Sequence, residues 1–298
     1  MTFTNPIFDT LCDLNVCDAG SVTRLQSYVR DRNDIDVLQC TRSGVIFLSS
    51  TDHIDLSHYN NKPPTHRFGT DKRAIITTND DTERRFKTFA NLVRGKRWLD
   101  VGAGSGAVLD RLGPLSSVCA AVEPQETAAG FLKELGHTVY RRLEDVPNAN
   151  FNIITLFHVF EHIQAPVELL RNLRSKLAEG GRLIIEVPHA RDFLISFVDC
   201  QAFRDHTFWS EHLILHTRQS LAALLEAGGF HVHSISGVHR YPLANALHWL
   251  DTGTPGGHEA WSALTDENLD TAWSHVLGRL DLTDTLVAEA RATQEALE

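Results

Sequence analysis

The stretch Leu-Asp-Val-Gly-Ala-Gly-Ser-Gly at residues 99–106 decides the fold of this chain. Trp98, Leu99 and Val101 are apolar residues typical of a buried strand, and residues 107–112 read as the start of a helix. The glycines between them let the backbone pass close to a ligand and present N–H groups to it. The stretch therefore predicts a strand, a ligand-binding turn and a helix in succession.

An acidic residue stands where a ribose would need it. Residues 117–122 form a second apolar run, and Glu123 ends that run. A carboxylate about 20 residues after a glycine turn, at the tip of the next strand, is placed to hold the two ribose hydroxyls. Together with the glycines, Glu123 indicates a cofactor that contains a nucleoside.

Two classes of protein compete for this pattern. Dinucleotide dehydrogenases favour Gly-x-Gly-x-x-Gly, whereas this loop is Gly-x-Gly-x-Gly with Asp100 before it. The chain resembles the class I S-adenosylmethionine (SAM) methyltransferases, which carry an acid–x–Gly–x–Gly–x–Gly loop and an acid that closes the second strand. The later strand at 151–157 and the Gly-Gly turn and strand within 177–188 follow in the same order. The resemblance covers residues 97–235.

The resemblance implies an α/β fold with a Rossmann-like class I methyltransferase core. We expect a mostly parallel seven-stranded sheet with helices on both faces, a small N-terminal lobe and a helical C-terminal extension. The expected parts are a lobe at 1–60, a linker and lid helix at 61–96, the core at 97–236 and an extension at 237–298. Within them we expect a strand at 45–48, the lid helix at 79–94, a helix at 217–227 and the final strand of the core at 231–235. We expect the extension to form a wall of the substrate site or the face of a homodimer, with an ordinary helical cap as the third alternative.

The resemblance further implies SAM as cofactor and S-adenosylhomocysteine as product. The residues that it implies for the cofactor are Asp100, Gly102, Gly104 and Gly106 at the methionine and ribose end, Glu123 at the ribose hydroxyls, Leu143 and Glu144 at the adenine edge, and Phe157 and His158 beneath the transferable methyl group.

A dense polar stretch at 203–217 follows the fifth strand, at the rim where open α/β sheets bind ligands. Its Glu211-His212 resembles the Tyr-x-Glu-His segment of deoxysugar C-methyltransferases, in which His and Tyr act as acid or base. Trp209 stands at the tyrosine position, so O- or N-methylation is favoured over C-methylation. The predicted catalytic residues are His206, His212 and Glu211. If a general base is needed, His206 and His212 are the leading candidates and His189 is a third. Alternatively, Glu211 and His212 only cap and fix the next helix.

The acceptor is expected to be a small polar molecule. The extension places Arg240, Tyr241 and Asn245 near a Pro-Gly-Gly loop, and His189 follows the fifth strand, so these four are the predicted substrate-binding residues. Resemblance to the sugar-modifying branch points to a nucleotide-linked or surface-polysaccharide sugar. The alternatives are a natural-product O-methyltransferase and a non-catalytic SAM-binding module, with a dehydrogenase a distant third.

No metal site is predicted. His158 and His162 stand four residues apart with Glu161 between them, but metal ligation needs a third ligand at matching geometry, and none is evident in the sequence. Near the N-terminus, residues 12, 17 and 40 are cysteines that resemble an incomplete zinc module in which Ser43 replaces a ligand. Buried structural cysteines are the preferred interpretation there.

The composition of the chain limits the kinds of molecule that we expect it to bind. The 298 residues carry a formal net charge of −10, which argues against a nucleic-acid or anionic-membrane surface. The basic clusters at 84–87 and 94–97 are interpreted as a solvated helix face and a turn. No signal peptide or long apolar segment opens the chain, so a cytoplasmic protein that acts on a small molecule is expected.

Overall fold

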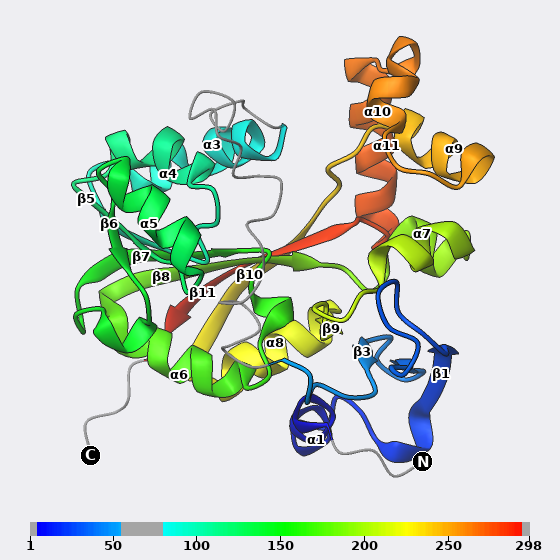
Figure 1. The fold of residues 1–298 in the computed structure, drawn as a ribbon, viewed down its shortest axis with the longest axis horizontal. Helices are drawn as coiled ribbons and strands as arrows, with labels where there is room; N and C mark the ends of the chain where they lie inside the picture. Colours follow the sequence, from blue (N-terminus) through cyan, green and yellow to red (C-terminus); the bar gives the residue numbers. More distant parts are fainter. Residues whose placement is uncertain (1–4, 55–79, 294–298) are drawn as a thin grey trace.

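The computed structural model, which describes residues 5–54 and 80–293, has a central sheet with helices on both of its faces and a small N-terminal lobe (Figure 1). Within these ranges the sheet has seven strands in the order β10-β11-β8-β7-β4-β5-β6. Their bounds are β4 (Arg97–Val101), β5 (Val118–Val122), β6 (Thr138–Tyr140), β7 (Phe151–Phe157), β8 (Leu177–Pro188), β10 (Phe230–Val238) and β11 (Thr285–Ala292). Strands β8, β7, β4, β5 and β6 are parallel, and β11 is antiparallel to both of its neighbours. The predicted class I methyltransferase fold is confirmed.

The sheet is covered on both faces by helices that pack into two separate apolar cores. Helices α3 (Asp80–Val93), α4 (Ala107–Leu112) and α5 (Glu126–Glu134) cover one face, and α6 (Pro166–Lys176) and α8 (Arg218–Ala227) cover the other (Figure 1). Because successive side chains of a strand point to opposite faces, Trp98 of β4 packs on the α3–α5 side and Leu99 on the α6–α8 side. The predicted helices at 79–94 and 217–227 correspond to α3 and α8, and Thr217 caps α8 by accepting from the Ser220 N–H. The predicted linker at 61–79 lies outside the described residues.

The remaining helical elements connect these parts or belong to the C-terminal segment. They are η3 (Gly113–Leu115), η4 (Leu143–Asp145), η5 (Phe160–His162), η6 (Phe193–Phe197), α7 (Gln201–Thr207), α9 (Leu243–Thr252), α10 (Gly257–Ala260), η7 (Ser262–Leu264) and α11 (Glu267–Leu280). A small apolar cluster centred on Leu194, Ala246 and Trp249 holds α9 against the segment that precedes α7. The extension therefore packs on the core through its first helix.

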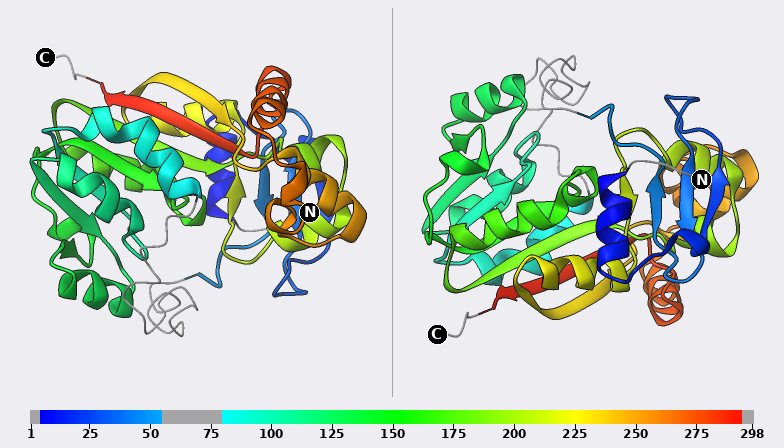
Figure 2. Two further views of the ribbon diagram at one scale, coloured as in Figure 1. Left: turned by 90° about the horizontal axis from the view of Figure 1, so that it is seen from above. Right: turned by 90° about the horizontal axis from the view of Figure 1, so that it is seen from below.

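The N-terminal lobe is completed by a strand from the core. It contains α1 (Pro6–Asp13), η1 (Ala19–Ser21), β1 (Val22–Gln26), β2 (Val37–Cys40) and β3 (Ile46–Leu48), and its sheet continues to β9 (Ile214–Leu215). Ile46 pairs with Leu215 across β3 and β9, and Phe208 is buried in the core of the lobe. Figure 2 shows the lobe at the same end of the molecule as α7 and α9–α11. The lobe is therefore anchored to the segment that follows α7.

The last strand of the sheet differs from the prediction. The predicted final strand at 231–235 lies within β10, but β11 follows it and inserts between β10 and β8. Thr285 pairs with both Pro188 and Val238 at the end of this insertion. The segment 237–298 is thus not a purely helical extension, because its last described part belongs to the core. Hydrogen bonding to strands on both sides stabilises β11, and a local pattern does not reveal such pairing.

Candidate active site

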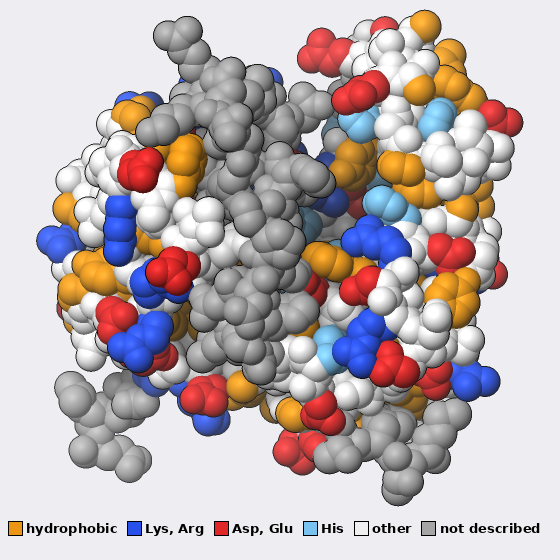
Figure 3. All heavy atoms as spheres, in the orientation of Figure 1, with side chains coloured by type: hydrophobic (Ala, Val, Ile, Leu, Met, Phe, Trp, Pro, Cys, Tyr) orange, Lys and Arg blue, Asp and Glu red, His pale blue; other side chains and the backbone are white. Residues whose placement is uncertain are grey.

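A cavity of ≈ 830 Å³ lies where the carboxyl ends of β4 and β7 meet η6, α7 and α9. This volume falls within the roughly 300–1,000 Å³ of small-molecule sites. Residues 102–105 of the glycine loop line one part of the cavity, and His206, Trp249 and Asn245 line another. Figure 3 shows histidine and basic side chains gathered on the face over α7 and below α9 and α10. The cavity is therefore one space with two chemically different ends.

The glycine loop acts through shape more than through free N–H groups. Gly102, Gly104 and Gly106 all have positive φ, at 78°, 54° and 81°. A Cβ at Gly102 would meet the Val159 side chain at 2.3 Å, and one at Gly106 would meet Leu132 at 2.3 Å. A Cβ at Gly104 would meet no atom within 4 Å, which is the space that a ligand beside the loop needs. The N–H groups of all three glycines are bonded within the protein, so the expectation that they face a ligand is wrong.

Asp100 lies at the end of β4 and lines the cavity although it is almost fully buried. Thr155 Oγ1 donates to Asp100 Oδ1 at 2.6 Å, and Trp98 Nε1 donates to the same threonine oxygen at 2.9 Å. Burial raises the pKa of Asp100 to about 7, against the opposing effect of the Thr155 hydrogen bond. The carboxyl group is held in a fixed orientation at the floor of the site.

Glu123 is hydrogen-bonded to the glycine loop and helps to fix its conformation. Its carboxylate accepts from the Gly104 N–H and the Gln125 N–H, each at 2.8 Å. Burial raises its pKa, and the two backbone hydrogen bonds oppose that rise. Glu123 does not line the cavity, but each of its oxygens has a further lone pair that a ribose hydroxyl could use.

The remaining predicted cofactor residues divide into two groups. Phe157 and His158, at the end of β7, line the cavity. Leu143 is buried in the core and Glu144 is exposed on η4, and neither lines the cavity. Gly106 also does not line it, because it faces Leu132.

His158 sits in a strained backbone conformation between two buried carboxylates. Its φ is 56°, its Nδ1 lies 3.2 Å from Glu161 Oε1, and its Nε2 lies 3.4 Å from Glu186 Oε1. Burial lowers the pKa of His158, but the two glutamates outweigh burial and raise it. Burial would likewise raise the pKa of Glu161, yet His158 and neighbouring histidines hold it at about 2. An ionised Glu161 carboxylate is therefore expected at neutral pH.

Arg84 and Arg85 are interpreted from the sequence as part of a solvated helix face, but both pair with the buried Glu186. Arg84 lies 2.8 Å and Arg85 lies 2.5 Å from the carboxylate of Glu186, whose side chain is fully buried. Burial would raise the pKa of Glu186, but His158 and the two arginines hold it well below its usual range. Arg85 also packs over the Phe157 ring, 4.7 Å from its centroid, and lines the cavity. Sequence reasoning missed Glu186, although a charged residue inside the apolar run 183–187 is a signal that could have found it.

The predicted catalytic residues around α7 occupy different environments. His206 is exposed, lines the cavity and packs on Trp249 with ring centroids 5.3 Å apart. Partial desolvation of its ring against the cavity wall, together with the nearby Arg30, lowers its pKa. His212 lines the cavity with Nδ1 at 3.0 Å from the Thr207 carbonyl oxygen, and burial and His162 lower its pKa to about 3. Glu211 is buried and does not line the cavity.

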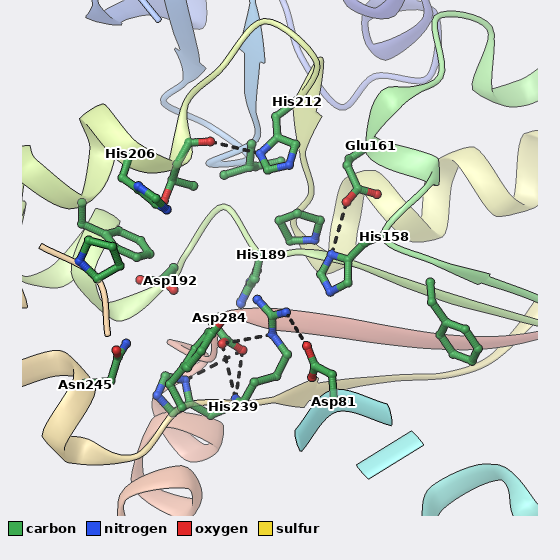
Figure 4. A pocket seen from close by; sticks show the side chains of 18 of the residues that line it. Asp81, His158, Glu161, His189, Asp192, His206, His212, His239, Asn245 and Asp284 are labelled. Atoms are coloured by element: carbon green, nitrogen blue, oxygen red, sulfur yellow. Dashed lines mark hydrogen bonds and ion pairs between the residues drawn. The ribbon is translucent and has the colours of Figure 1, made fainter. Parts of the chain in front are cut away.

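Folding brings His212 to Glu161 and His162. One ligand atom from each of these three residues lies within 4.8 Å of the others, and among the described residues this is a group that could hold a metal ion. Figure 4 shows Glu161 and His212 on one side of the cavity, opposite Asp81 and Asp284. The expectation that no third ligand lies beside Glu161 and His162 is therefore wrong, because His212 lies there in the fold.

The predicted substrate residues all line the cavity, but one of them has an internal role. Arg240 Nη1 lies 3.1 Å from Asp81 Oδ2, and its Nε lies 3.3 Å from Asp284 Oδ2. Its guanidinium is thus paired with two carboxylates of the protein. The predicted contact of Arg240 with an acceptor stays a prediction. Asn245 is buried at the cavity wall, whereas Tyr241 is more exposed.

His189 and Asp192 are buried and both line the cavity. The His189 Nδ1 atom lies 2.9 Å from the Thr283 carbonyl oxygen, and burial lowers its pKa to about 4. Asp192, which sequence reasoning missed, accepts from the Leu194 N–H at 2.6 Å and lines the cavity. Burial and the neighbouring Asp284 raise the pKa of Asp192 to about 7.

The family model for the methyltransferase domain matches residues 73–235, which is more than half of the chain. The chain belongs to the methyltransferase domain family. This SAM-dependent methyltransferase has the fold and the glycine loop that the sequence predicted, and the alternative of a dehydrogenase is wrong. No helix among the described residues is long and apolar enough to cross a membrane.

Individual relatives of this methyltransferase are distant. A ubiquinone biosynthesis O-methyltransferase of Coxiella burnetii is 24% identical over 169 residues, which cover 51% of this chain and 71% of the relative. The mitochondrial ubiquinone biosynthesis O-methyltransferase of Schizosaccharomyces pombe is 27% identical over 106 residues, which cover 32% and 39%. The structure of Haemonchus contortus phosphoethanolamine N-methyltransferase 2 with SAM matches with a TM-score of 0.51 at 15% identity, covering 82% of this chain and 61% of that chain. The last likeness shows the fold alone.

The N-terminal cysteines of the methyltransferase are free thiols. Cys17 and Cys40 are buried, and Cys40 Sγ lies 3.3 Å from Ser21 Oγ. Burial raises the pKa of Cys17 to about 12, whereas hydrogen bonds from Ser21 and Ser43 outweigh burial and lower that of Cys40 to about 7. The lobe therefore holds one thiol that ionises more readily than its neighbours.

Proposed function

We propose that this methyltransferase transfers the methyl group of SAM to a hydroxyl group of a small polar acceptor, a nucleotide-linked or surface-polysaccharide sugar. The observation that carries the proposal is the composition of the acceptor end of the cavity. Asp192, His206 and Asn245 supply hydrogen-bonding groups there, and Trp249 supplies an aromatic surface. Such a mixture of polar groups and an aromatic wall suits a ring that carries hydroxyls.

SAM is assigned to the end of the cavity that the glycine loop forms. Its methionine and ribose moieties would lie along residues 100–104, where the open space at Gly104 fits a ligand. Each carboxylate oxygen of Glu123 accepts one backbone hydrogen bond, from Gly104 or Gln125, and its other lone pair would accept from a ribose hydroxyl. The sulfonium methyl would lie beyond Phe157 and His158, toward the acceptor end. The placements along residues 100–104 and beyond Phe157 and His158 follow from the cavity lining, and that of Glu123 follows from its hydrogen bond to the Gly104 N–H.

His206 is assigned as the general base. The acceptor oxygen attacks the methyl carbon in line with the departing sulfur, the C–S bond breaks, and a C–O bond forms. The hydroxyl proton passes to His206, whose lowered pKa keeps its imidazole neutral near pH 7 and able to accept a proton. His212 is a weaker base because burial lowers its pKa to about 3. Holding the acceptor oxygen and the methyl carbon in line is the main contribution of the protein.

The test combines binding with a panel of acceptors. Isothermal titration with SAM and then with S-adenosylhomocysteine measures cofactor binding without any acceptor. Mass spectrometry then follows methyl transfer to nucleotide sugars and polysaccharide fragments, with catechols and other phenols as a comparison. We expect transfer to at least one sugar hydroxyl and reduced turnover in His206→Asn.

A phenolic acceptor is the second candidate, because the relatives described above are named as O-methyltransferases of ubiquinone biosynthesis. Transfer to phenols without transfer to any sugar would select this candidate and overturn the sugar assignment. Transfer to nitrogen alone would overturn the choice of a hydroxyl group. Absence of SAM binding at millimolar ligand would contradict the cofactor assignment itself.

A further inference from the structure

We propose that Glu161, His162 and His212 form a binding site for one divalent transition-metal ion at the acceptor end of the cavity. Glu161 and His162 come from η5, directly after β7, and His212 comes from the segment between α7 and β9. One ligand atom from each residue lies within 4.8 Å of the others, and all three residues line the cavity. An ion bound there would face the same space as the glycine loop.

Backbone hydrogen bonds hold the two segments together before any ion binds. The Leu213 N–H donates to the Glu161 carbonyl oxygen at 3.0 Å. His162 Nδ1 lies 2.6 Å from the Glu211 carbonyl oxygen, so each segment contacts the other in both directions. The two segments are therefore held side by side before an ion binds, which reduces the conformational entropy lost on binding.

The same contacts fix the tautomers that a metal requires. A ring nitrogen that contacts a carbonyl oxygen must carry a proton, so Nδ1 is protonated in both His162 and His212. A neutral imidazole with Nδ1–H carries its remaining ring lone pair on Nε2, the atom through which each histidine would bind the ion. Metal-binding histidines commonly donate their other N–H to a backbone carbonyl in this way.

Glu161 supplies the negative charge. Its side chain is fully buried, and Oε1 contacts His158 Nδ1 at 3.2 Å. Its second oxygen, Oε2, is buried without a hydrogen-bond partner among the described residues. A buried carboxylate oxygen without a partner is costly, and a cation beside it removes that cost.

The donor set indicates which ions fit. Two imidazole nitrogens and one carboxylate oxygen suit zinc, iron, cobalt or nickel, whereas Mg²⁺ and Ca²⁺ prefer oxygen ligands only. A His₂Glu set is also a known ligand set for catalytic zinc, in which a further position stays open. An acceptor hydroxyl bound at that open position would have a lowered pKa and would lose its proton more readily to His206. This role rests on the proposed function, but ion binding does not.

The experiment measures ion binding without an acceptor. The full-length protein is freed of metal with a chelator and titrated with Zn²⁺ by calorimetry and with Co²⁺ by visible absorption. We expect one ion per chain, with d–d bands of nitrogen and oxygen ligation and no thiolate charge-transfer band. Glu161→Gln and His212→Asn should weaken binding at least about 100-fold, since loss of even an outer partner of a metal ligand costs roughly 10–100-fold.

Two controls separate this site from others in the chain. His206→Asn removes an imidazole from the same cavity, and it should bind Zn²⁺ as the wild type does. Cys40→Ser tests the thiols of the N-terminal lobe and should also bind normally. Binding that is lost in Cys40→Ser, a thiolate band with Co²⁺, or no Zn²⁺ binding by the wild type would overturn the proposal. The wild-type Co²⁺ spectrum decides the ligand type even if His212→Asn does not fold.

Discussion

Arg240 and Asp81 join the two sides of the cavity: Nη1 of the arginine lies 3.1 Å from Oδ2 of the aspartate. Asp81 belongs to the first turn of α3, and Arg240 follows β10. The same guanidinium contacts Asp284, immediately before β11. One side chain thus links α3, which precedes the glycine loop in sequence, to the C-terminal segment. Burial alone would lower the pKa of Arg240, but Asp284 and Asp81 outweigh burial and raise it.

Arg240→Ala should destabilise the protein. It leaves Asp284 buried without its cation, and Asp81 loses one of its basic partners. Breaking a buried pair costs about 3–5 kcal/mol, and partial exposure of Arg240 reduces the expected loss to about 2–3 kcal/mol. Urea unfolding measures the free energy. Arg182→Ala, which breaks the more exposed pair with Glu289, is the control and should cost under about 1 kcal/mol. Normal stability with impaired acceptor turnover would instead place Arg240 on the acceptor.

Gly104→Val should abolish SAM binding without unfolding the protein. The new side chain would enter the open space beside the loop and occupy the proposed ligand position. Gly136→Val is matched to it, because Gly136 also has a positive φ and open space around its Cβ but does not line the cavity. Each substitution should cost about 1–3 kcal/mol of backbone strain. Calorimetry with SAM should detect binding only in Gly136→Val, and equal affinity in the two variants would refute the loop assignment.

Asn245→Ala should impair acceptor binding and leave SAM affinity unchanged. The side chain lines the acceptor end and comes from α9, away from the glycine loop. Loss of one hydrogen bond to a neutral acceptor corresponds to about 0.5–1.5 kcal/mol, or a rise in KM of roughly 2–10-fold. Asn268→Ala on the exposed surface of α11 is the control. An unchanged KM in Asn245→Ala would remove α9 from the acceptor site.

Stability should fall as the solution becomes mildly acidic. Burial lowers the pKa of His189 and His216 to about 4, while an unfolded histidine has a pKa near 6.5. The unfolded state then binds protons that the folded state cannot, so the stabilisation is complete above about pH 6.5 and is lost as the pH falls toward about 4. Thermal unfolding across this window measures the slope.

The variant His216→Gln isolates one of these groups. It should make the dependence on pH shallower between about pH 6.5 and 4, because one buried titrating group is removed. His275→Gln, on the exposed face of α11, should leave the slope as in the wild type. A slope that His216→Gln leaves unchanged would mean that His216 titrates normally in the folded protein.

The glycine loop and the strand ends at the proposed cofactor site could be predicted because their signals are local. Gly102 and Gly106 occupy positive φ values next to Val159 and Leu132, where a Cβ has no room, so glycine is required. Asp100 and Glu123 each end a strand, and the carboxyl ends of parallel strands meet at one edge of the sheet. The strand, the turn and the acid each have a recognisable pattern within a few consecutive residues, and these patterns predicted the core from β4 to β10.

The tertiary structure alone decided the acceptor end and the charges around it. His212 reaches Glu161 and His162 because β9 pairs with β3 of the N-terminal lobe and fixes the preceding segment over η5. Arg85 turns inward because Glu186 is buried on β8 and requires a cation. Strand β11 enters the sheet through hydrogen bonds to strands on both sides. Contacts between distant segments depend on how the chain packs, and no spacing or periodicity within a single segment records them.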